Sequence, residues 1–301
     1  QGAVGFKLFM GAQIGGLNHD DDQSLHEGLK SAGESGAVVA VHAEDKALLM
    51  ANEQKLKQAK HNGPTDFLFA HSEEVEKKAI QRLLKASDKT AVHIHFCHVT
   101  SKQGLGVIGE AKKAGKTVTC EVTPNHLMLS SAEVRHYGMM AIIAPPLRDR
   151  NHQEALWSGL SSEVVDSLGS DHAPHTPEEK SASNVWEVKV GVPGLETTLP
   201  LMLTMFKKNR LPLPRMVELL AEKPAQIFGL KGKGRLEQGK DADLTIIDYK
   251  RNWTIDALKF KSKAKFSPYN GWGVTGKPVK TFVNGGLVMD EGEIVAKPGN
   301  E

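Results

Sequence analysis

Four side chains that can bind metal ions or transfer protons stand at the ends of short apolar runs. They are Lys7 in GFKLFM, His42 in VVAVHAED, His98 in HFCHVTS and Asp171 in SLGSDHAPH. Neutral imidazoles and carboxylates are standard ligands of Zn²⁺ and similar ions. The carboxyl ends of the strands of a (β/α) barrel converge on one face, so the four side chains could meet there. A single strand histidine is more often a hydrogen-bonded core residue, but four strand ends together favour a metal site.

Lys7 is the unexpected member of this set, because its neighbours predict a buried strand. Those neighbours are Val4, Phe6, Leu8 and Phe9. A bare ammonium is costly to bury, and burial favours the neutral amine. A neutral amine can add CO2 to give a carbamate, an anionic ligand whose two oxygens could bridge two metal ions. A lysine that reaches solvent from a strand end explains the same residue equally well.

Alternation along the third apolar run divides its side chains between two faces. Ile94, Phe96 and His98 fall on one face, whereas His93 and His95 fall on the other. We therefore interpret the HIH sequence as unrelated to the metal site.

The balance of charged residues argues against a protein that binds nucleic acid or anionic lipid. The 301-residue chain has 38 basic and 36 acidic residues and a net charge of +2, with no basic patch for nucleic acid or anionic lipid. No apolar stretch is long enough to span a bilayer, and the first residues show no basic-then-apolar pattern of a signal peptide.

Cys97 and Cys120 lie in apolar runs without C-x-x-C spacing, which predicts core thiols in a reducing cytoplasm. We expect a soluble, cytoplasmic, homo-oligomeric protein with a small-molecule substrate, no nucleic-acid partner and no membrane contact.

Short apolar runs alternate with helical patterns, which is typical of βα units around a parallel sheet. The predicted strands are Ala3–Phe9, Ala37–His42, Val92–Val99, Thr117–Thr123, Met140–Ile143 and Val165–Gly169. Helices are predicted over Ser24–Glu34, opened by a capping box of Ser24 and Glu27, and over Ser72–Ser87. From Gly232 onward, short strands with glycine turns predict a small β appendage. We expect a barrel domain over 1–230 and a small β-sandwich portion with the tail over 231–301.

Together these motifs resemble the amidohydrolase superfamily, in its branch of cyclic amidases. They are GFKLFM, VVAVHAED, HFCHVTS, CEVTPNHL, APPLR, GSDHAPHTPEEK, GVPGLETTLP and GRLEQGKDADLTIID, spread over nearly the whole chain. The resemblance implies a (β/α)8 TIM-barrel fold and metal-dependent ring opening of a cyclic amide. Within the branch, DHAPHTPEEK followed by GVPGLETTLPLML is most similar to the dihydroorotases, which interconvert dihydroorotate and N-carbamoyl-aspartate in pyrimidine biosynthesis.

The resemblance also assigns roles. Lys7 would be the carboxylated lysine that bridges two Zn²⁺ ions, and His42 and His98 would bind one of them. Asp171 would bind the other and act as general acid and base. The substrate would contact His175 and the backbone of Ala144, Val190 and Gly191.

Two departures leave alternatives open. Nothing in the chain matches the family's His-x-His pair or the arginine that binds a substrate carboxylate, and the chain opens without Met on strand-like residues. We therefore expect the first barrel strands to be missing. The lysine form of GFKLFM is shared by hydantoinases, allantoinases and other dihydroorotases, so hydantoinase/dihydropyrimidinase and allantoinase activities are alternatives. A catalytically inactive dihydroorotase-like structural partner or fragment is a further one.

Overall fold

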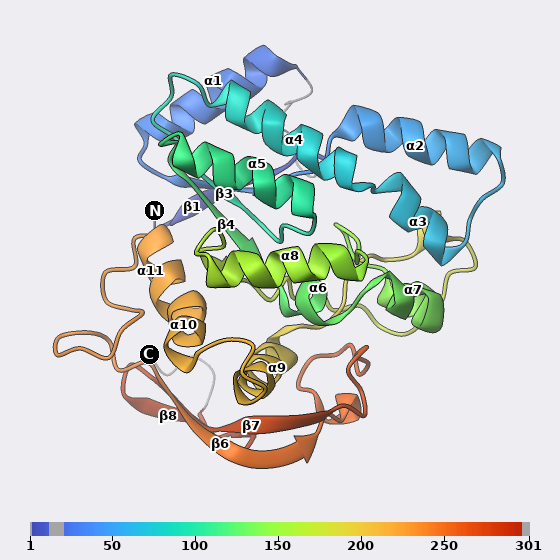
Figure 1. Ribbon diagram of the computed structural model, residues 1–301. Helices are drawn as coiled ribbons and strands as arrows, with labels where there is room; N and C mark the ends of the chain where they lie inside the picture. The colour runs from blue at the N-terminus through green and yellow to red at the C-terminus, as the bar shows by residue number, and fades with distance from the viewer. Residues whose placement is uncertain (1, 12–20, 297–301) are drawn as a thin grey trace.

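The computed structural model describes residues 2–11 and 21–296. Five strands form a parallel sheet in the order β1-β2-β3-β4-β5. They are β1 (Gly5–Phe9), β2 (Val38–His42), β3 (His93–Phe96), β4 (Val118–Val122) and β5 (Ser167–Leu168). Each strand follows the previous one through at least one helix, so the predicted βα order is confirmed (Figure 1).

Helices fill the connections. They are α1 (Asp22–Glu34), α2 (Lys46–Gln58), α3 (Pro64–Ala70), α4 (Glu73–Ala86), α5 (Lys102–Lys113), α6 (Pro124–Met128), α7 (Ser131–Tyr137), α8 (Arg150–Ser161), α9 (Leu195–Lys207), α10 (Leu213–Val217) and α11 (Lys223–Ile227), with short turns η1 (Gly138–Ala141), η2 (Val185–Glu187), η3 (Glu218–Glu222) and η4 (Ala257–Lys259). The predicted capping box of α1 is wrong, since Asp21 is the cap and its Oδ1 accepts from the Ser24 amide at 2.8 Å.

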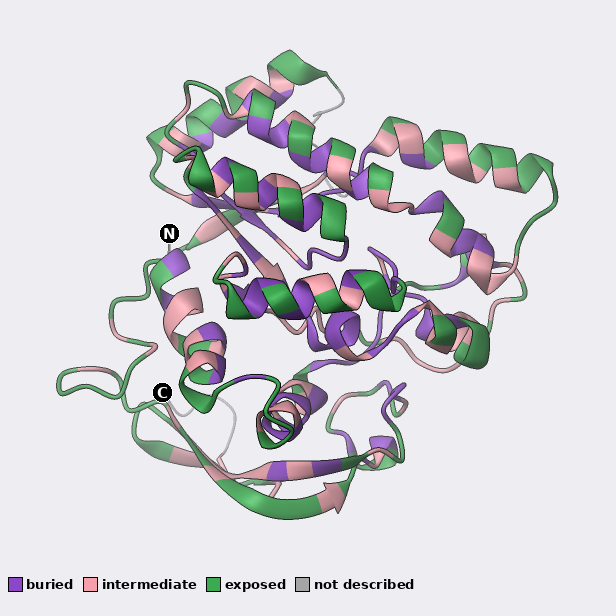
Figure 2. Ribbon diagram, viewed as in Figure 1, coloured by how far each residue is buried: buried purple, intermediate pink, exposed green. Residues whose placement is uncertain are grey.

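The sheet has one apolar face and one polar face. On the apolar face, alternate residues such as Val41, Ile94 and Phe96 are fully buried against helices that include α4 and α5 (Figure 2). On the other face, the register places Lys7, Ala40, His95 and Thr119 in one row across four strands. Residues in one row of a sheet point to the same side, so the polar face carries the groups that can do chemistry.

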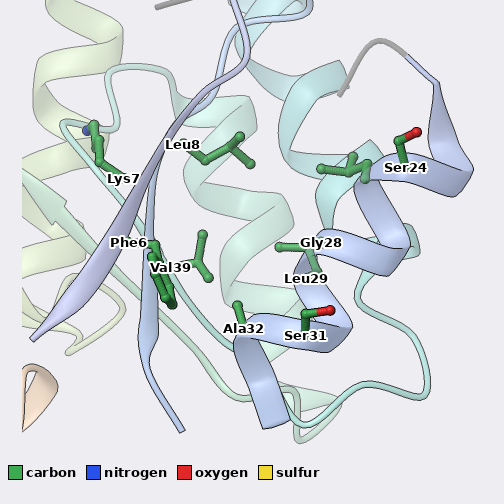
Figure 3. A pocket seen from close by; sticks show the side chains of 10 residues that line it. Phe6, Lys7, Leu8, Ser24, Gly28, Leu29, Ser31, Ala32 and Val39 are labelled. Carbon is green, nitrogen blue, oxygen red and sulfur yellow. The ribbon is translucent and has the colours of Figure 1, made fainter. Parts of the chain in front are cut away.

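The edge strand β1 is less buried than its sequence predicts. Val4 and Phe6 are 50% and 52% exposed, because β1 pairs only with β2 within the described sheet. A pocket of about 470 Å³ separates β1 from α1 and is lined by Leu8, Leu25 and Leu29 among others. Lys7 points from β1 away from α1, whereas Leu8 points toward it (Figure 3). The burial assumed for Lys7 is therefore wrong: its side chain is exposed.

The predicted strand over Met140–Ile143 is also wrong. This segment is the turn η1 followed by extended chain, although Ile142 and Ile143 are buried in a second apolar cluster. The Ile142 carbonyl accepts hydrogen bonds from the Lys180 ammonium and the Gly191 amide instead of from a neighbouring strand. The apolar run over 140–143 therefore indicates burial of these side chains, but it does not indicate a strand.

The C-terminal part forms a four-stranded antiparallel sheet in the order β6-β7-β8-β9. Its strands are β6 (Leu244–Thr254), β7 (Gly273–Val283), β8 (Gly286–Asp290) and β9 (Glu293–Ile294). The hairpin between β7 and β8 turns at Asn284 and Gly285, both with positive φ, as a tight two-residue turn requires.

This sheet packs on α9 at the bottom of Figure 1, and the segment between β6 and β7 enters the second apolar cluster. There the Tyr269 hydroxyl donates to Asn125 Oδ1 at 2.9 Å. A domain division at residue 230 stays a prediction. Within the described residues, no helix combines the length and apolarity needed to cross a membrane.

Candidate metal centre

The structure brings His42 and His98 into direct contact. His42 ends β2, and His98 lies just beyond β3 with a φ of 38°, which turns the chain out of the strand. His42 Nδ1 and His98 Nε2 are 3.2 Å apart. Two nitrogens bound to one tetrahedral Zn²⁺ at about 2.0–2.1 Å lie roughly 3.3 Å apart. The two imidazoles therefore fit a single ion held between them.

His98 has the properties of a neutral ligand. Burial, followed by the nearby positive charges of His42 and Lys7, lowers the pKa of His98 well below its ordinary value. Its Nδ1 is buried and has no hydrogen-bond partner in the described structure. Buried polar atoms are rarely left unsatisfied. Because the neutral ring carries one proton, a proton on Nδ1 leaves the lone pair of Nε2, the atom nearest His42, available to an ion.

Glu44 orients the imidazole ring of His42 by contacting its second nitrogen, Nε2. His42 Nε2 lies 2.7 Å from one Glu44 oxygen, and His71 Nδ1 lies 2.7 Å from the other. Burial opposes ionisation of Glu44, but His71 and His42 together hold its pKa well below the ordinary value. An ionised Glu44 requires a proton on His42 Nε2, which leaves the Nδ1 lone pair free to face His98.

We expect Glu44→Gln to weaken Zn²⁺ binding by about 10–100-fold, because the amide no longer fixes the His42 ring as an ionised acceptor does. Metal affinity measured by competition with a chelator checks this. Glu53→Gln, on the exposed side of α2, is the matched control and should bind as the wild type does. Equal affinities in the two variants would contradict a role for Glu44 in the metal centre.

Lys7 and Asp171 lie near the histidine pair. Asp171 follows β5 and has a φ of 44°, in the left-handed region. Burial raises the pKa of Asp171, while the positive charges of His42 and Lys7 act in the opposite direction. The Lys7 ammonium lies 3.0 Å from the Cys97 sulfur and 5.0 Å from the centre of the Phe9 ring. The charges of Lys7 and His42 act on both His98 and Asp171, so the four predicted ligands lie in one region, and their roles as ligands stay a prediction.

Alternation correctly places His95 opposite the buried Ile94 and Phe96, but His98 does not share the face of those two residues as predicted. The prediction that Cys97 is a core thiol is wrong. His95 is 1% exposed and stands in the row that contains Lys7, on the polar face. Cys97 is on this face too, whereas Cys120 is a core thiol, as predicted. The alternation of side chains fails at His98, because the backbone has already left the strand there.

The predicted substrate residues gather on neighbouring loops. His175 Nε2 lies 3.2 Å from the Val190 carbonyl, and Val190 is 38% exposed. The Gly191 amide donates to the Ile142 carbonyl at 3.0 Å, which joins this loop to the segment that ends at Ala144. Gly191 has a φ of 134°, and an added Cβ would lie 2.5 Å from the Cβ of Ala173. The loop therefore requires glycine at this position.

Lys180 ties these loops together and was not predicted. Its side chain is fully buried, and its ammonium donates to the carbonyls of Ile142 at 2.7 Å and Gly191 at 3.0 Å. Burial lowers the pKa of Lys180 to about 8. No sequence signal marks this lysine, because its neighbours in HTPEEKSAS are those of an exposed loop.

Lys180 makes folding stability depend on pH. Its folded-state pKa of about 8 lies below the ordinary 10.5, so the unfolded chain holds more protons between these values. Stability then rises with pH in this window. Relative to Lys180→Met, the free energy of unfolding of the wild type should rise by roughly 2 kcal/mol between pH 7 and 10. Denaturant titrations check this. Lys189→Met, at an exposed site, should show no such difference; a similar rise there would refute the assignment.

Comparison with known proteins identifies the family. The model of the Amidohydrolase family matches residues 15–288. The chain belongs to the amidohydrolase family. An L-hydantoinase of Paenarthrobacter aurescens is 37% identical over 99% of the chain and 66% of its own length. A dihydroorotase of Pyrococcus horikoshii is 37% identical over 98% of the chain and 63% of its own length. The chain spans just under two thirds of the length of these curated relatives.

Solved structures show the same relationship. The L-hydantoinase from Arthrobacter aurescens superposes with a TM-score of 0.94 at 36% identity, covering 98% of the chain and 67% of that structure. A D-hydantoinase from a Thermus species has a TM-score of 0.92 at 27% identity, covering 98% and 66%. The predicted amidohydrolase barrel fold and the resemblance to the cyclic-amidase branch are confirmed. Dihydroorotases and hydantoinases match at similar identity, so the comparison does not distinguish between these substrates.

Proposed function

We propose that this protein hydrolyses a cyclic amide with the help of two Zn²⁺ ions, and that dihydroorotate and N-carbamoyl-aspartate are the reacting pair. The contact of His42 with His98 supports this most directly, because its 3.2 Å separation suits one ion. Asp171, which faces the same region, would bind the other ion. Lys7 would bridge the two as its carbamate, which forms when its neutral amine, exposed to solvent here, adds CO2 and releases a proton.

Asp171 moves the proton in this proposal. When bound, the ions would polarise the scissile carbonyl and activate water. Asp171 takes the proton of the attacking water and delivers it to the amide nitrogen that leaves the ring.

The loops beside the centre would orient the substrate. His175 and the backbone of Val190 and Ala144 lie on segments that Lys180 holds together. A ring held on these groups presents its carbonyl in a fixed direction, which lowers the entropic cost of attack. His172 supports the same region, because its Nδ1 accepts from the Gly194 amide at 3.0 Å at the start of α9.

Hydantoin is the second candidate substrate, since an L-hydantoinase matches over 99% of the chain with a TM-score of 0.94 for a solved L-hydantoinase. The test compares kcat/KM for dihydroorotate, hydantoin and dihydrouracil, which lacks the carboxylate of dihydroorotate. Our proposal predicts preference for dihydroorotate and a role in pyrimidine biosynthesis. Preference for hydantoin would assign the second candidate. Turnover of none of these substrates would contradict both and favour an inactive structural partner.

We also propose a cytoplasmic homo-oligomer. The exposed edge of β1, with Val4 and Phe6 on its surface, is the kind of apolar edge that soluble proteins usually cover. Analytical ultracentrifugation should therefore show assemblies larger than one chain. A stable monomer at all concentrations would contradict this.

A further inference from the structure

Three metal-binding side chains meet on the polar face of the sheet beside the histidine pair. They are His95 of β3, Cys97 just after β3 and Glu121 of β4. A ring nitrogen of His95, the Cys97 sulfur and a carboxylate oxygen of Glu121 all lie within 4.8 Å of one another. His95 is buried and the other two are half-buried. The predicted ligands of the candidate centre include none of the three.

We propose that His95, Cys97 and Glu121 bind a Zn²⁺ ion at a site separate from the one between His42 and His98. Thiolate, imidazole and carboxylate are the three common protein ligands of zinc, and three ligands leave a fourth position for water. His95 Nε2 and Glu121 Oε2 are already 3.4 Å apart, close to the separation of two ligands on one ion. Small rotations of the Cys97 and Glu121 side chains complete the site.

Thr119 orients the His95 ring through a hydrogen bond to Nδ1. His95 Nδ1 lies 2.9 Å from Thr119 Oγ1, which is also 2.8 Å from His93 Nε2. When the Nδ1 proton is donated to this hydroxyl, the lone pair of His95 Nε2 points toward Glu121. Metal-binding histidines are commonly oriented in this way by a hydrogen bond to the second ring nitrogen.

Charge balance also favours the ion. Zn²⁺ displaces the thiol proton of Cys97 to solvent, so that a thiolate, a carboxylate and a neutral imidazole give a site of zero net charge. Lys7 contacts the sulfur but is exposed, so its ammonium can move into solvent when the ion binds.

Cobalt tests the site independently of activity. Co²⁺ is added to the metal-free full chain, and absorption is followed in the near ultraviolet, where a thiolate ligand gives a sulfur-to-cobalt charge-transfer band. We expect this band in the wild type and its loss in Cys97→Ser. Cys120→Ser is the matched control: its hydroxyl can replace the hydrogen bond to the Val164 carbonyl, and the band should remain. Thr119→Val should lower Co²⁺ affinity by about 10–100-fold.

A second variant separates this site from the candidate centre. His42→Asn should retain the band, because His42 does not belong to the proposed site. Loss of the band in His42→Asn, with circular dichroism unchanged, would place Cys97 on the ion between His42 and His98 and overturn the separate site. Cobalt binding to the wild type without a charge-transfer band would overturn thiolate ligation altogether.

Discussion

Asp171→Asn should lower kcat/KM for ring opening by about 10²–10⁴-fold, the usual contribution of a positioned general acid and base. Asparagine has nearly the same shape but cannot take the proton of the attacking water. It also tolerates the left-handed backbone at this position, where φ is 44°. The loss should therefore arise from chemistry and not from a distorted loop. Steady-state kinetics with the preferred substrate, together with zinc content, measure it.

Asp149→Asn provides the matched control. Asp149 caps α8 through bonds to the amides of Asn151 and His152, and asparagine caps helices about as well as aspartate. The same substitution should leave kcat/KM unchanged there. If Asp171→Asn retained activity within tenfold of the wild type, another group would have to carry the proton, and the role given to Asp171 would be wrong.

Arg148→Met should reduce the free energy of unfolding by about 3–5 kcal/mol, since it leaves a buried charge without its partner. The Arg148 guanidinium is 3.6 Å from Glu76 and donates to Thr100 Oγ1 at 3.0 Å and to the His71 carbonyl. Glu76 is 2% exposed. Methionine has a similar length but cannot balance the Glu76 carboxylate. Denaturant-induced unfolding of wild type and variant gives the difference.

Two further variants make this prediction specific. Arg251→Met breaks an exposed pair with Glu291 and should cost no more than about 1 kcal/mol. The double variant Arg148→Met with Glu76→Gln should recover part of the stability, because the unpaired charge is then gone. Equal losses in the free energy of unfolding for Arg148→Met and Arg251→Met would contradict a larger contribution from the buried Arg148–Glu76 pair.

The sequence predicted the alternation of strands and helices well, because burial and strand ends leave local signals. Apolar runs located five strands, and two of the predicted strand ends bring His42 and His98 into contact. The ligand roles of Lys7, His42, His98 and Asp171 stay predictions. The convergence of these strand ends follows from parallel strands, whose carboxyl ends share one edge. These conclusions need only the alternation of short apolar runs with helices.

Local patterns failed where tertiary contacts decide the outcome. Ile142 and Ile143 are buried without a strand, because Lys180 and Gly191 satisfy the Ile142 carbonyl. His98 reaches His42 through a positive φ that strand alternation cannot predict. The support of His42 by Glu44 and His71 also depends on contacts between segments distant in sequence.

Zinc dependence of ring opening tests the account most directly. The protein is freed of metal with a chelator, and ring opening of dihydroorotate and hydantoin is measured before and after Zn²⁺ is restored. The account predicts turnover that is lost on chelation and recovered with zinc, and no recovery when His42 or His98 is replaced by alanine. Ring opening that survives complete removal of metal would contradict the account.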